Sequence, residues 1–414
     1  MEFLQCVSLS EARAIITAKF TGRPWPAEKV PLLGALGRVA AADIAAGEDL
    51  PAFSRSTVDG FAVRSADTYG ASEAAPALFT LAGEILMGRA APVALTPGQA
   101  ILIHTGGMLP PGADAVVMLE HSEQLDDKTL LINGAVAPGE NVVHRGEDIA
   151  AGSPVLTAGQ TITARRVGLL AACGVSRVLV AKRPRVAVLS SGDEIVEIEE
   201  TPAAGQVRDI NSYTLAAMLT EAGCQADRLG IARDCFEDFL AVLSQAVADY
   251  DLILLSGGSS VGARDHAVRA IGELGSPGVL IHGIAMKPGR PTIFGLAGRL
   301  PVFGLPGHPV AAITVCEELV KPAIRAMLGQ PPAGRRLPVA AGLARNLASL
   351  PGRDDFVSVR LGRRPEGYVA EPILGKSGLI TAIAHADGTL HLPYDKSGLY
   401  AGDQVEVLLF EDHK

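Results

Sequence analysis

The stretch from Asp251 to Asp265, DLILLSGGSSVGARD, joins an apolar run to glycines, small polar residues and an acid that opens the next helix. Such a run is typical of a buried parallel strand, whose carboxyl end opens onto the ligand crevice of an α/β sheet. The backbone N–H groups of a Gly and Ser loop there, with the following helix N-terminus, can bind an anion. No Gly-Lys-Ser/Thr follows, so this is not a Walker A loop. The alternative is a plain tight turn between strand and helix.

Two further apolar runs end in loops of small residues. Residues 185–194 read RVAVLSSGDE, and residues 300–309 read LPVFGLPGHP. If the three strands are parallel neighbours, their loops converge on one crevice. The repetition therefore favours a ligand site at this edge of a sheet.

A pair of cations lies between these runs, in the segment IAMKPGRP at residues 284–291. Pro288 and Pro291 fix the backbone beside Lys287 and Arg290, so the two side chains are presented with little freedom. Two positioned cations beside Gly-rich loops suit a multiply charged oxyanion. A solvated surface pair is the alternative, since charged side chains usually face water.

Composition narrows the class of protein. At 414 residues the chain is too long for a single core, so we expect two to four domains. The formal net charge of −9 argues against nucleic-acid binding, although local cations can still reverse the field inside a cleft. No uninterrupted apolar stretch is long enough for a membrane span, and the first residues lack the features of a signal peptide. We therefore expect neither a nucleic-acid nor a membrane partner.

The 5 cysteines are scattered and form no C-x-x-C pair, which indicates small thiols in a reducing cytoplasm rather than disulfides or a zinc site. Cys173 and Cys316 fall in predicted helices among apolar neighbours, where a core position is favoured.

Four regions follow from the patterning. Residues 1–50 with 145–182 form an elongated N-terminal and linking region, whose predicted helices Ser8 to Phe20 and Thr163 to Cys173 are expected to pack side by side. Residues 51–144 carry short apolar runs between turns and predict a small, mostly β domain. Strand and helix patterns alternate over residues 183–329, as in a doubly wound sheet. Residues 330–414 predict a compact β-barrel or sandwich. The fold class is thus multidomain, α/β plus β.

Three polar groupings lie outside the α/β region: SRSTVDGFAV at residues 54–63, TGGMLPPGAD at 105–114 and HRGEDIAAG at 144–152. The first puts Asp59 beside Gly60 in a loop that leads into a strand. Each has a plain alternative, because Asp-Gly turns are common and charged clusters usually face water.

Taken together and in order, the motifs STVDGFAV, TGGMLPPGADAVVMLE, HRGEDI, SSGDEI, INSYTL, LSGGSSVGARD, AMKPGRP and LPGHP resemble those of the MoeA family. These are the molybdopterin molybdenumtransferases, also represented by the E domain of gephyrin-like proteins. The resemblance runs from near residue 8 to near residue 410.

The resemblance implies a fold, an activity and partners. It implies a MogA-like α/β domain that binds molybdopterin, and a C-terminal β-barrel. Family members release AMP from adenylylated molybdopterin and insert molybdate at the dithiolene to form the molybdenum cofactor, with Mg²⁺ as the expected ion. They are elongated homodimers, in which the small β domain of one subunit completes the site of the other. A MogA-type adenylyltransferase would deliver the intermediate, and an apo-molybdoenzyme would receive the product.

The resemblance also implies roles for individual residues. Catalytic roles fall to Asp59, Thr105, Glu194, Asp234, Asp265 and Lys287. Substrate binding falls to Arg145, Asp148, Ser191, Gly192, Asp193, Gly257, Gly258, Ser259, Ser260, Gly262, Pro288, Gly289, Arg290, Pro306, Gly307, His308, Pro309 and Ser377. Metal binding falls to Asp265 and Asp234. Asp59 and Thr105 would reach across to the partner's crevice.

The chemistry of these residues is compatible with that activity. Cleavage of a phosphoanhydride needs charge neutralisation and a positioned water more than covalent chemistry. Asp59, Glu194 and Asp265 carry oxygens of the kind that Mg²⁺ prefers, and one of them could instead be the general base. The loop from Gly257 to Gly262 would hold a phosphate, while Lys287 and Arg290 would attract the molybdate dianion.

Several positions depart from the family pattern. His308 and Ala311 stand where Asn and Ser are usual, and Arg290 replaces a lysine, which changes a point charge into a fork. Ser259, Lys376 and Asp387 are further departures. His308, as a lone histidine between Gly307 and Pro309, favours a capping or packing role over a ligand role.

These departures keep alternatives open. One is a carrier of the same fold that holds molybdopterin without inserting metal, and another is a homologue that handles tungstate. A third is the adenylyltransferase, although that family is a single small α/β domain and this chain has further regions.

Overall fold

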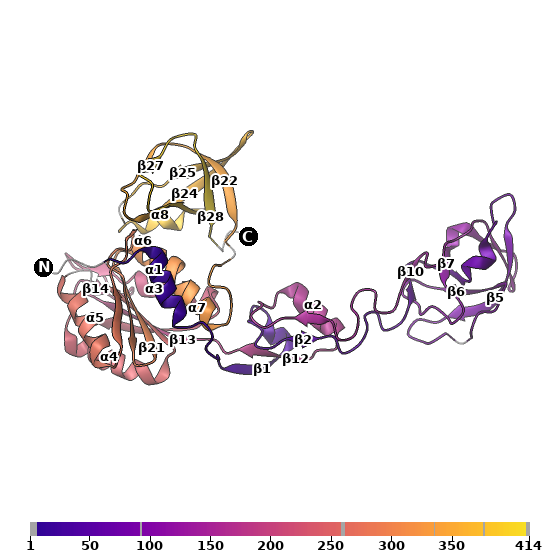
Figure 1. The fold of residues 1–414 in the computed structure, drawn as a ribbon, viewed down its shortest axis with the longest axis horizontal. Coiled ribbons are helices and arrows are strands. Elements are labelled where there is room, and N and C mark those ends of the chain that lie inside the picture. Colours follow the sequence, from indigo (N-terminus) through magenta and orange to yellow (C-terminus); the bar gives the residue numbers. More distant parts are fainter. Residues whose placement is uncertain (1–5, 92, 258–260, 335, 376, 411–414) are drawn as a thin grey trace. The chain divides into compact units, whose positions relative to one another are not determined.

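The computed structural model describes residues 6–91, 93–257, 261–334, 336–375 and 377–410; for residues 261–265 and 382 it describes the backbone. The chain divides into two compact units (Figure 1). Unit 1 comprises Met1–Glu28 and Ala181–Lys414, and unit 2 comprises Lys29–Val180. Among the described residues, no helix combines the length and the apolar character needed to cross a membrane.

Unit 1 is built on a six-stranded sheet. Its order is β16 (Gln225–Ala232), β13 (Arg185–Ser191), β17 (Leu252–Gly257), β21 (Leu300–Leu305), β20 (Ile293–Ala297) and β18 (Gly278–His282). The first four strands are parallel, which confirms the predicted α/β sheet and the adjacency of its three central strands. Only β20 runs in the opposite direction: it is antiparallel to both of its neighbours, β21 and β18, and it connects to β21 through a tight turn at Gly298, whose φ is +63°.

Helices cover both faces of this sheet, as Figure 1 shows. They are α3 (Asn211–Glu221), α4 (Phe236–Asp249), α5 (Val261–Glu273), α6 (Pro309–Val315), a π-helical turn η4 (Cys316–Val320) and α7 (Lys321–Met327). A small pair, β14 (Ile195–Val196) and β15 (Val207–Arg208), leads into α3. Phe239, Leu243 and Ile253 are among the buried side chains of the core between α4, α5 and the sheet.

Two helices predicted from capping and periodicity are present. In α1 (Leu9–Ala18) the Ser8 hydroxyl accepts the Glu11 N–H at 3.1 Å, as capping-box spacing predicts. The helix α2 (Ala164–Ala172) begins after Thr163, whose hydroxyl accepts the Arg166 N–H. The expectation that they pack side by side is wrong. The apolar face of α1 packs on α7 in unit 1, whereas α2 packs on the 3₁₀ turn η1 (Leu32–Ala35) in unit 2.

Unit 2 contains the predicted small β domain. Its sheet has the order β7 (Ala115–Met118), β4 (Gly60–Val63), β6 (Gln99–Ile103), β5 (Ala77–Ile85), β9 (Thr129–Ile132) and β8 (Ser122–Gln124). Two 3₁₀ turns, η2 (Ser65–Thr68) and η3 (Leu119–His121), flank it. The linking region consists of strand pairs: β1 (Ala27–Pro31) with β12 (Arg177–Ala181), β2 (Ile44–Ala45) with β11 (Pro154–Leu156), and β3 (Arg55–Ser56) with β10 (Val142–Val143).

The C-terminal region closes into a five-stranded barrel. The strands are β24 (Asp354–Arg364), β25 (Gly367–Pro372), β22 (Pro338–Leu343), β28 (Gln404–Leu409) and β26 (Gly388–Leu392), and β26 pairs back onto β24. A short pair, β23 (Leu347–Ala348) with β27 (Gly398–Leu399), and helix α8 (Ile380–Ala384) complete it. This closure settles the predicted choice between barrel and sandwich. A further strand, β19 (Met286–Lys287), joins the barrel from the α/β domain by pairing with β24.

The thiols are free in all five cases. Cys224 and Cys316 are buried, and burial raises the pKa of Cys224 to about 12. Cys173, which was predicted to be a core residue, is half-buried. It is the C-cap of α2, since the helix ends at Ala172.

Candidate active site

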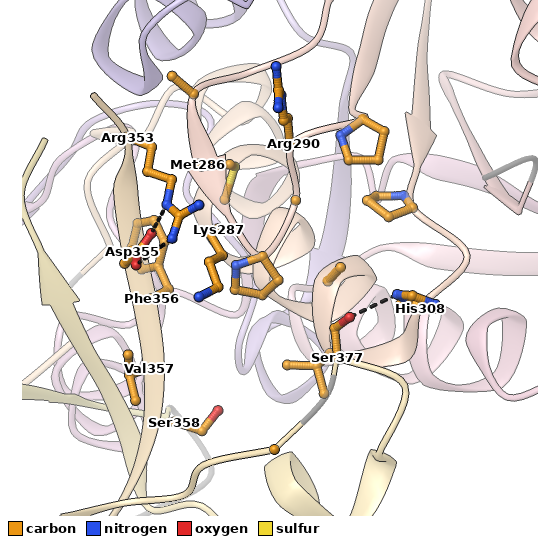
Figure 2. A pocket seen from close by; sticks show the side chains of 18 of the residues that line it. Met286, Lys287, Arg290, His308, Arg353, Asp355, Phe356, Val357, Ser358 and Ser377 are labelled. Carbon is orange, nitrogen blue, oxygen red and sulfur yellow. Dashed lines mark hydrogen bonds and ion pairs between the residues drawn. The ribbon is translucent and has the colours of Figure 1, made fainter. Parts of the chain in front are cut away.

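A cavity of about 900 Å³ lies in unit 1, between the α/β domain and the barrel. Three cations line it: Lys287, Arg290 and Arg353. Figure 2 shows Lys287 between the Arg353–Asp355 pair and the side chains of His308 and Ser377. Within the described part of the chain, Asp355 is the one carboxylate that lines this cavity. A cavity of this kind suits an anionic ligand.

The loop that carries Lys287 and Arg290 is held at both ends. At one end β19 pairs with β24 so that Lys287 lies opposite Asp355. At the other, the Ile284 N–H donates to the Arg290 carbonyl at 2.9 Å. Gly289 between them has a φ of +123°, and a Cβ there would lie 2.7 Å from a Val315 methyl group. The sequence A-M-K-P-G-R-P therefore forms a rigid loop, in which this glycine allows the close packing on α6.

Arg353 is oriented by a buried carboxylate. Its Nε donates to Asp355 Oδ1 at 2.8 Å, and the Ser349 hydroxyl donates to Asp355 Oδ2 at 2.9 Å. Asp355 is only 4% exposed, and Arg353 Nη2 also donates to its Oδ2 at 3.3 Å, so the arginine balances the buried charge. This two-point contact fixes the guanidinium of Arg353, which lines the cavity.

The loop LPGHP forms another wall. His308 stands at the N-cap of α6, and its Nδ1 lies 2.8 Å from the Ser377 hydroxyl of the barrel. From the α/β side, the Asn211 amide donates to the Gly307 carbonyl at 2.9 Å and to Ser256 Oγ at 2.8 Å. The predicted residues Pro306, His308, Ser377, Pro288 and Gly289 all line the cavity. His308 thus ties the α/β domain to the barrel instead of capping the helix with its side chain.

A separate acidic cluster lies at the ends of β13 and β16. The Asp234 N–H is 3.4 Å from Asp193 Oδ1, and a Cβ on Gly192 would lie 2.7 Å from Glu194 Oε2. Partial burial, followed by the nearby charges of Asp193 and Glu194, raises the pKa of Asp234. Asp234 Oδ1 is buried and has no hydrogen-bond partner in the described part of the chain.

This cluster fits a divalent cation. An unpartnered, desolvated carboxylate oxygen beside two further acids is costly unless a positive charge approaches it. Within the described residues there is no preformed group of three metal-ligating side chains. Mg²⁺ often needs no such cage, since it is commonly held by one or two carboxylates, water and substrate phosphates.

The strands below the cluster are in close contact. Ser191 pairs with Gly257, which has a φ of +123°, and a Cβ on Gly257 would lie 2.0 Å from the Ser191 carbonyl oxygen. Glycine is therefore required at the start of this loop. The predicted residues Gly258, Ser259 and Ser260 lie outside the described residues. Gly262 and Asp265 fall on α5, where the structure describes their backbone and not the Asp265 side chain.

A third group lies in unit 2. The Thr105 N–H donates to Asp59 Oδ1 at 2.8 Å, and the same oxygen is 3.5 Å from His104 Nδ1. The other ring nitrogen of His104 is 3.1 Å from Glu84 Oε1. The Thr105 N–H is the main cause of a lowered pKa at Asp59, while the hydrogen bond to Glu84 is the main cause of a raised pKa at His104.

The motif HRGEDI lies elsewhere in unit 2, just after β10. The Arg145 Nε forms an ion pair with Asp49 at 2.7 Å, and its backbone N–H donates to Ser54 Oγ. Asp148 is exposed, and its N–H donates to the Leu50 carbonyl at 3.0 Å. The loop is thus anchored to Asp49, Leu50 and Ser54, which lie just before and at the start of the SRSTVDGFAV motif.

Comparison with known families gives three matches in chain order. They are the MoeA N-terminal region (domains I and II) at residues 7–174, a probable molybdopterin binding domain at residues 187–326 and the MoeA C-terminal region (domain IV) at residues 340–410. A molybdopterin molybdenumtransferase of Staphylococcus epidermidis is 32% identical over 379 residues, which cover 91% of this chain and 90% of that protein. The chain belongs to the MoeA family.

Two further similar proteins support the assignment to the MoeA family. Molybdopterin molybdenumtransferase 2 of Mycobacterium tuberculosis is 35% identical over 382 residues, 91% of this chain and 94% of that protein. The crystal structure of a MoeA molybdopterin biosynthesis protein from Pyrococcus horikoshii is similar, with a TM-score of 0.83, 38% identity and coverage of 98% of this chain and 100% of that one.

Sequence reasoning about this MoeA-family chain missed several side chains. Arg353 and Asp355 were not predicted as site residues, since a Pro-Gly-Arg sequence is typical of a turn at the surface. Cys6, whose Sγ is 3.5 Å from Arg290 Nε, and His104 were also missed. Asn211 lies in the motif INSYTL, and the available signal was an amide at the first residue of a helix. The cavity also differs from expectation, because the described residues lining it include none from the loops after β13 and β17.

Proposed function

We propose that this protein is a molybdopterin molybdenumtransferase that releases AMP from adenylylated molybdopterin and inserts molybdate into the dithiolene. The observation that carries the proposal is the cavity lined by Lys287, Arg290 and Arg353. Relatives at 32–35% identity are named molybdopterin molybdenumtransferases. The reaction requires a site for a dianion beside a site for a phosphoanhydride, and unit 1 offers a candidate for each.

Molybdate is assigned to the cavity. Its two negative charges would be met by the Lys287 ammonium and by the forks of Arg290 and Arg353. Insertion replaces one oxide of molybdate with the two dithiolene sulfurs, and that oxide leaves as water with the two thiol protons. Cations that hold the remaining oxygens would stabilise the charge as this exchange proceeds.

AMP release is assigned to the acidic cluster. Water adds to a phosphorus of the anhydride, the bridging P–O bond breaks, and the products are AMP and molybdopterin, which keeps its own phosphate group. Asp234, with Asp265, would hold Mg²⁺, which supplies neutralisation of phosphate charge when bound. Glu194 and Asp193, which lie near Asp234, would orient or deprotonate the water, while the Gly257 loop would bind a phosphate.

Asp59 and Thr105 are assigned to the same reaction from a second copy of the chain. They belong to unit 2, whereas the cavity and the acidic cluster belong to unit 1. A homodimer with shared sites, as the family resemblance implies, would bring the two groups together. We further propose that the reaction occurs in the cytoplasm, that a MogA-type adenylyltransferase supplies the intermediate and that an apo-molybdoenzyme accepts the product.

The proposal is tested by product formation. Purified protein is incubated with adenylylated molybdopterin, molybdate and Mg²⁺, and the product is assayed by reconstitution of an apo-molybdoenzyme. Reconstitution that depends on this protein supports the transferase. Pterin that co-purifies with the protein but never becomes metal-loaded would instead support a carrier, the alternative favoured by the apolar Ala311 in the cavity wall. Replacing molybdate with tungstate in the same assay shows which oxyanion is used.

A further inference from the structure

The small β domain contains a histidine whose two ring nitrogens each face a carboxylate. His104 directly follows β6, Glu84 belongs to β5, and Asp59 lies in the loop between β3 and β4. The distances are 3.1 Å from Nε2 to Glu84 and 3.5 Å from Nδ1 to Asp59. These two acids are the charged groups that the described part of unit 2 places against the ring. Three segments distant in the sequence therefore meet at one imidazole.

The contacts that link Glu84, His104 and Asp59 restrict the orientation of the Asp59 carboxylate. The Thr105 N–H fixes Oδ1 from the backbone, and the His104 ring approaches the same oxygen from the side. Asp59 and His104 are 55% and 45% exposed, so a single contact of either would be weak. Because Glu84 holds Nε2 of His104, the ring is already restrained, and it loses less conformational entropy on contacting Asp59 than a free histidine would.

We propose that His104 is a positioning residue: held by Glu84, it orients the Asp59 carboxylate for AMP release. This inference rests on the proposed function, in which Asp59 acts at the site of a second copy. A ring that donates from both nitrogens carries a positive charge, so Glu84 balances the charge of the ring as well as holding it. His104 itself contacts no substrate in this role.

The kinetic test uses variants of the full-length protein. His104→Met removes both contacts at similar volume and is expected to lower kcat for molybdate-dependent AMP release roughly tenfold, because a misplaced group loses its alignment. The KM for molybdate is expected to stay unchanged, since the cavity of Lys287 and Arg353 is untouched. His104→Gln keeps one donor and is expected to recover part of the loss. His121→Gln, at an exposed histidine of the same unit, is the matched control.

A spectroscopic test does not depend on turnover. In ¹⁵N-labelled protein the His104 imidazole is expected to lose its second proton at a higher pH in wild type than in Glu84→Gln, because the hydrogen bond to Glu84 raises the pKa of His104. Glu84→Gln also serves as the second kinetic variant if His104→Met fails to fold.

The possible outcomes distinguish a failure of the proposed function from a failure of the positioning role of His104. Wild type that releases no AMP would overturn the proposed function and, with it, the positioning role. Active wild type with folded His104→Met and Glu84→Gln variants of equal kcat would overturn only the positioning role. A raised KM for molybdate with unchanged kcat would also contradict it.

Discussion

Three cations from two domains line one cavity, and each is presented by a different device. Lys287 lies on a two-residue strand paired with the barrel, Arg290 follows a glycine packed on α6, and Arg353 is held by the buried Asp355. Cations that are already fixed lose little conformational entropy when an anion binds, so more of the electrostatic attraction appears as binding free energy. Lys287 and Arg290 could be predicted from the flanking prolines. Arg353 could not, because its orientation depends on a carboxylate and a serine that become its neighbours only after folding.

At this scale we predict that Arg353→Gln weakens molybdate binding. Losing one charge-assisted contact costs about 1.5–3 kcal/mol, so the dissociation constant is expected to rise roughly 10- to 150-fold. Equilibrium titration with molybdate checks this. Arg363→Gln, at an exposed arginine of β24, is the control and is expected to leave binding unchanged. Equal affinities for wild type and the Arg353 variant would remove Arg353 from the site.

The orphaned oxygen of Asp234 leads to a second prediction. Mg²⁺ is expected to raise the Tm of wild type, because the ion binds the folded acidic cluster and not the unfolded chain. In Asp234→Asn the upward shift is expected to shrink or vanish, since one charged ligand is lost. Thermal unfolding with Mg²⁺ and with EDTA measures both. A full Mg²⁺ shift in the variant would place the ion elsewhere.

At the scale of elements, apolar runs predicted the sheet of unit 1, because a buried parallel strand must be continuously apolar. The antiparallel β20, the edge strand β18 and the two-residue β19 were not predicted, since their pairing depends on long-range neighbours rather than on their own periodicity. For the same reason, the pattern of apolar residues in 330–414 does not distinguish a barrel from a sandwich: only the pairing of β26 with β24 closes the barrel. The mistaken pairing of α1 with α2 arose because an apolar helix face does not specify its partner.

One buried carboxylate fixes α1 and the barrel linker to the α/β domain. Glu318, in the π-helical turn, is 2% exposed and pairs with Arg13 of α1 and with Arg336 before β22. Removing its charge leaves two arginines without their partner. We predict that Glu318→Gln destabilises unit 1 by about 2 kcal/mol, less than a fully buried pair because Arg13 is partly exposed.

Calorimetry measures this effect. The transition of unit 1 is expected to move down by about 5 °C in Glu318→Gln. Glu366→Gln, at an exposed position between β24 and β25, is expected to change it by less than about 1 °C. A Glu318 variant that unfolds like the control would show that this network is not a stabilising one.

At the scale of the molecule, the two units carry different parts of the proposed site. The oxyanion cavity and acidic cluster are in unit 1, and the Asp59 group is in unit 2. If sites are shared between two copies, Asp59→Ala and Lys287→Ala should each abolish product formation but complement one another. After subunit exchange, half of the dimers are mixed and each mixed dimer has one intact site, so about a quarter of wild-type activity is expected.

The complementation assay needs two controls. Each variant must stay folded and dimeric by circular dichroism and sedimentation, and exchange must be shown with a labelled subunit. No recovery under demonstrated exchange would contradict the shared site.

The most direct test of the central claim is AMP release from adenylylated molybdopterin in Mg²⁺, measured with and without molybdate. The account predicts that AMP appears when molybdate is present, that the pterin becomes metal-loaded and that Arg353→Gln needs more molybdate for the same rate. Tight binding of the intermediate with no AMP released at any molybdate concentration would contradict it.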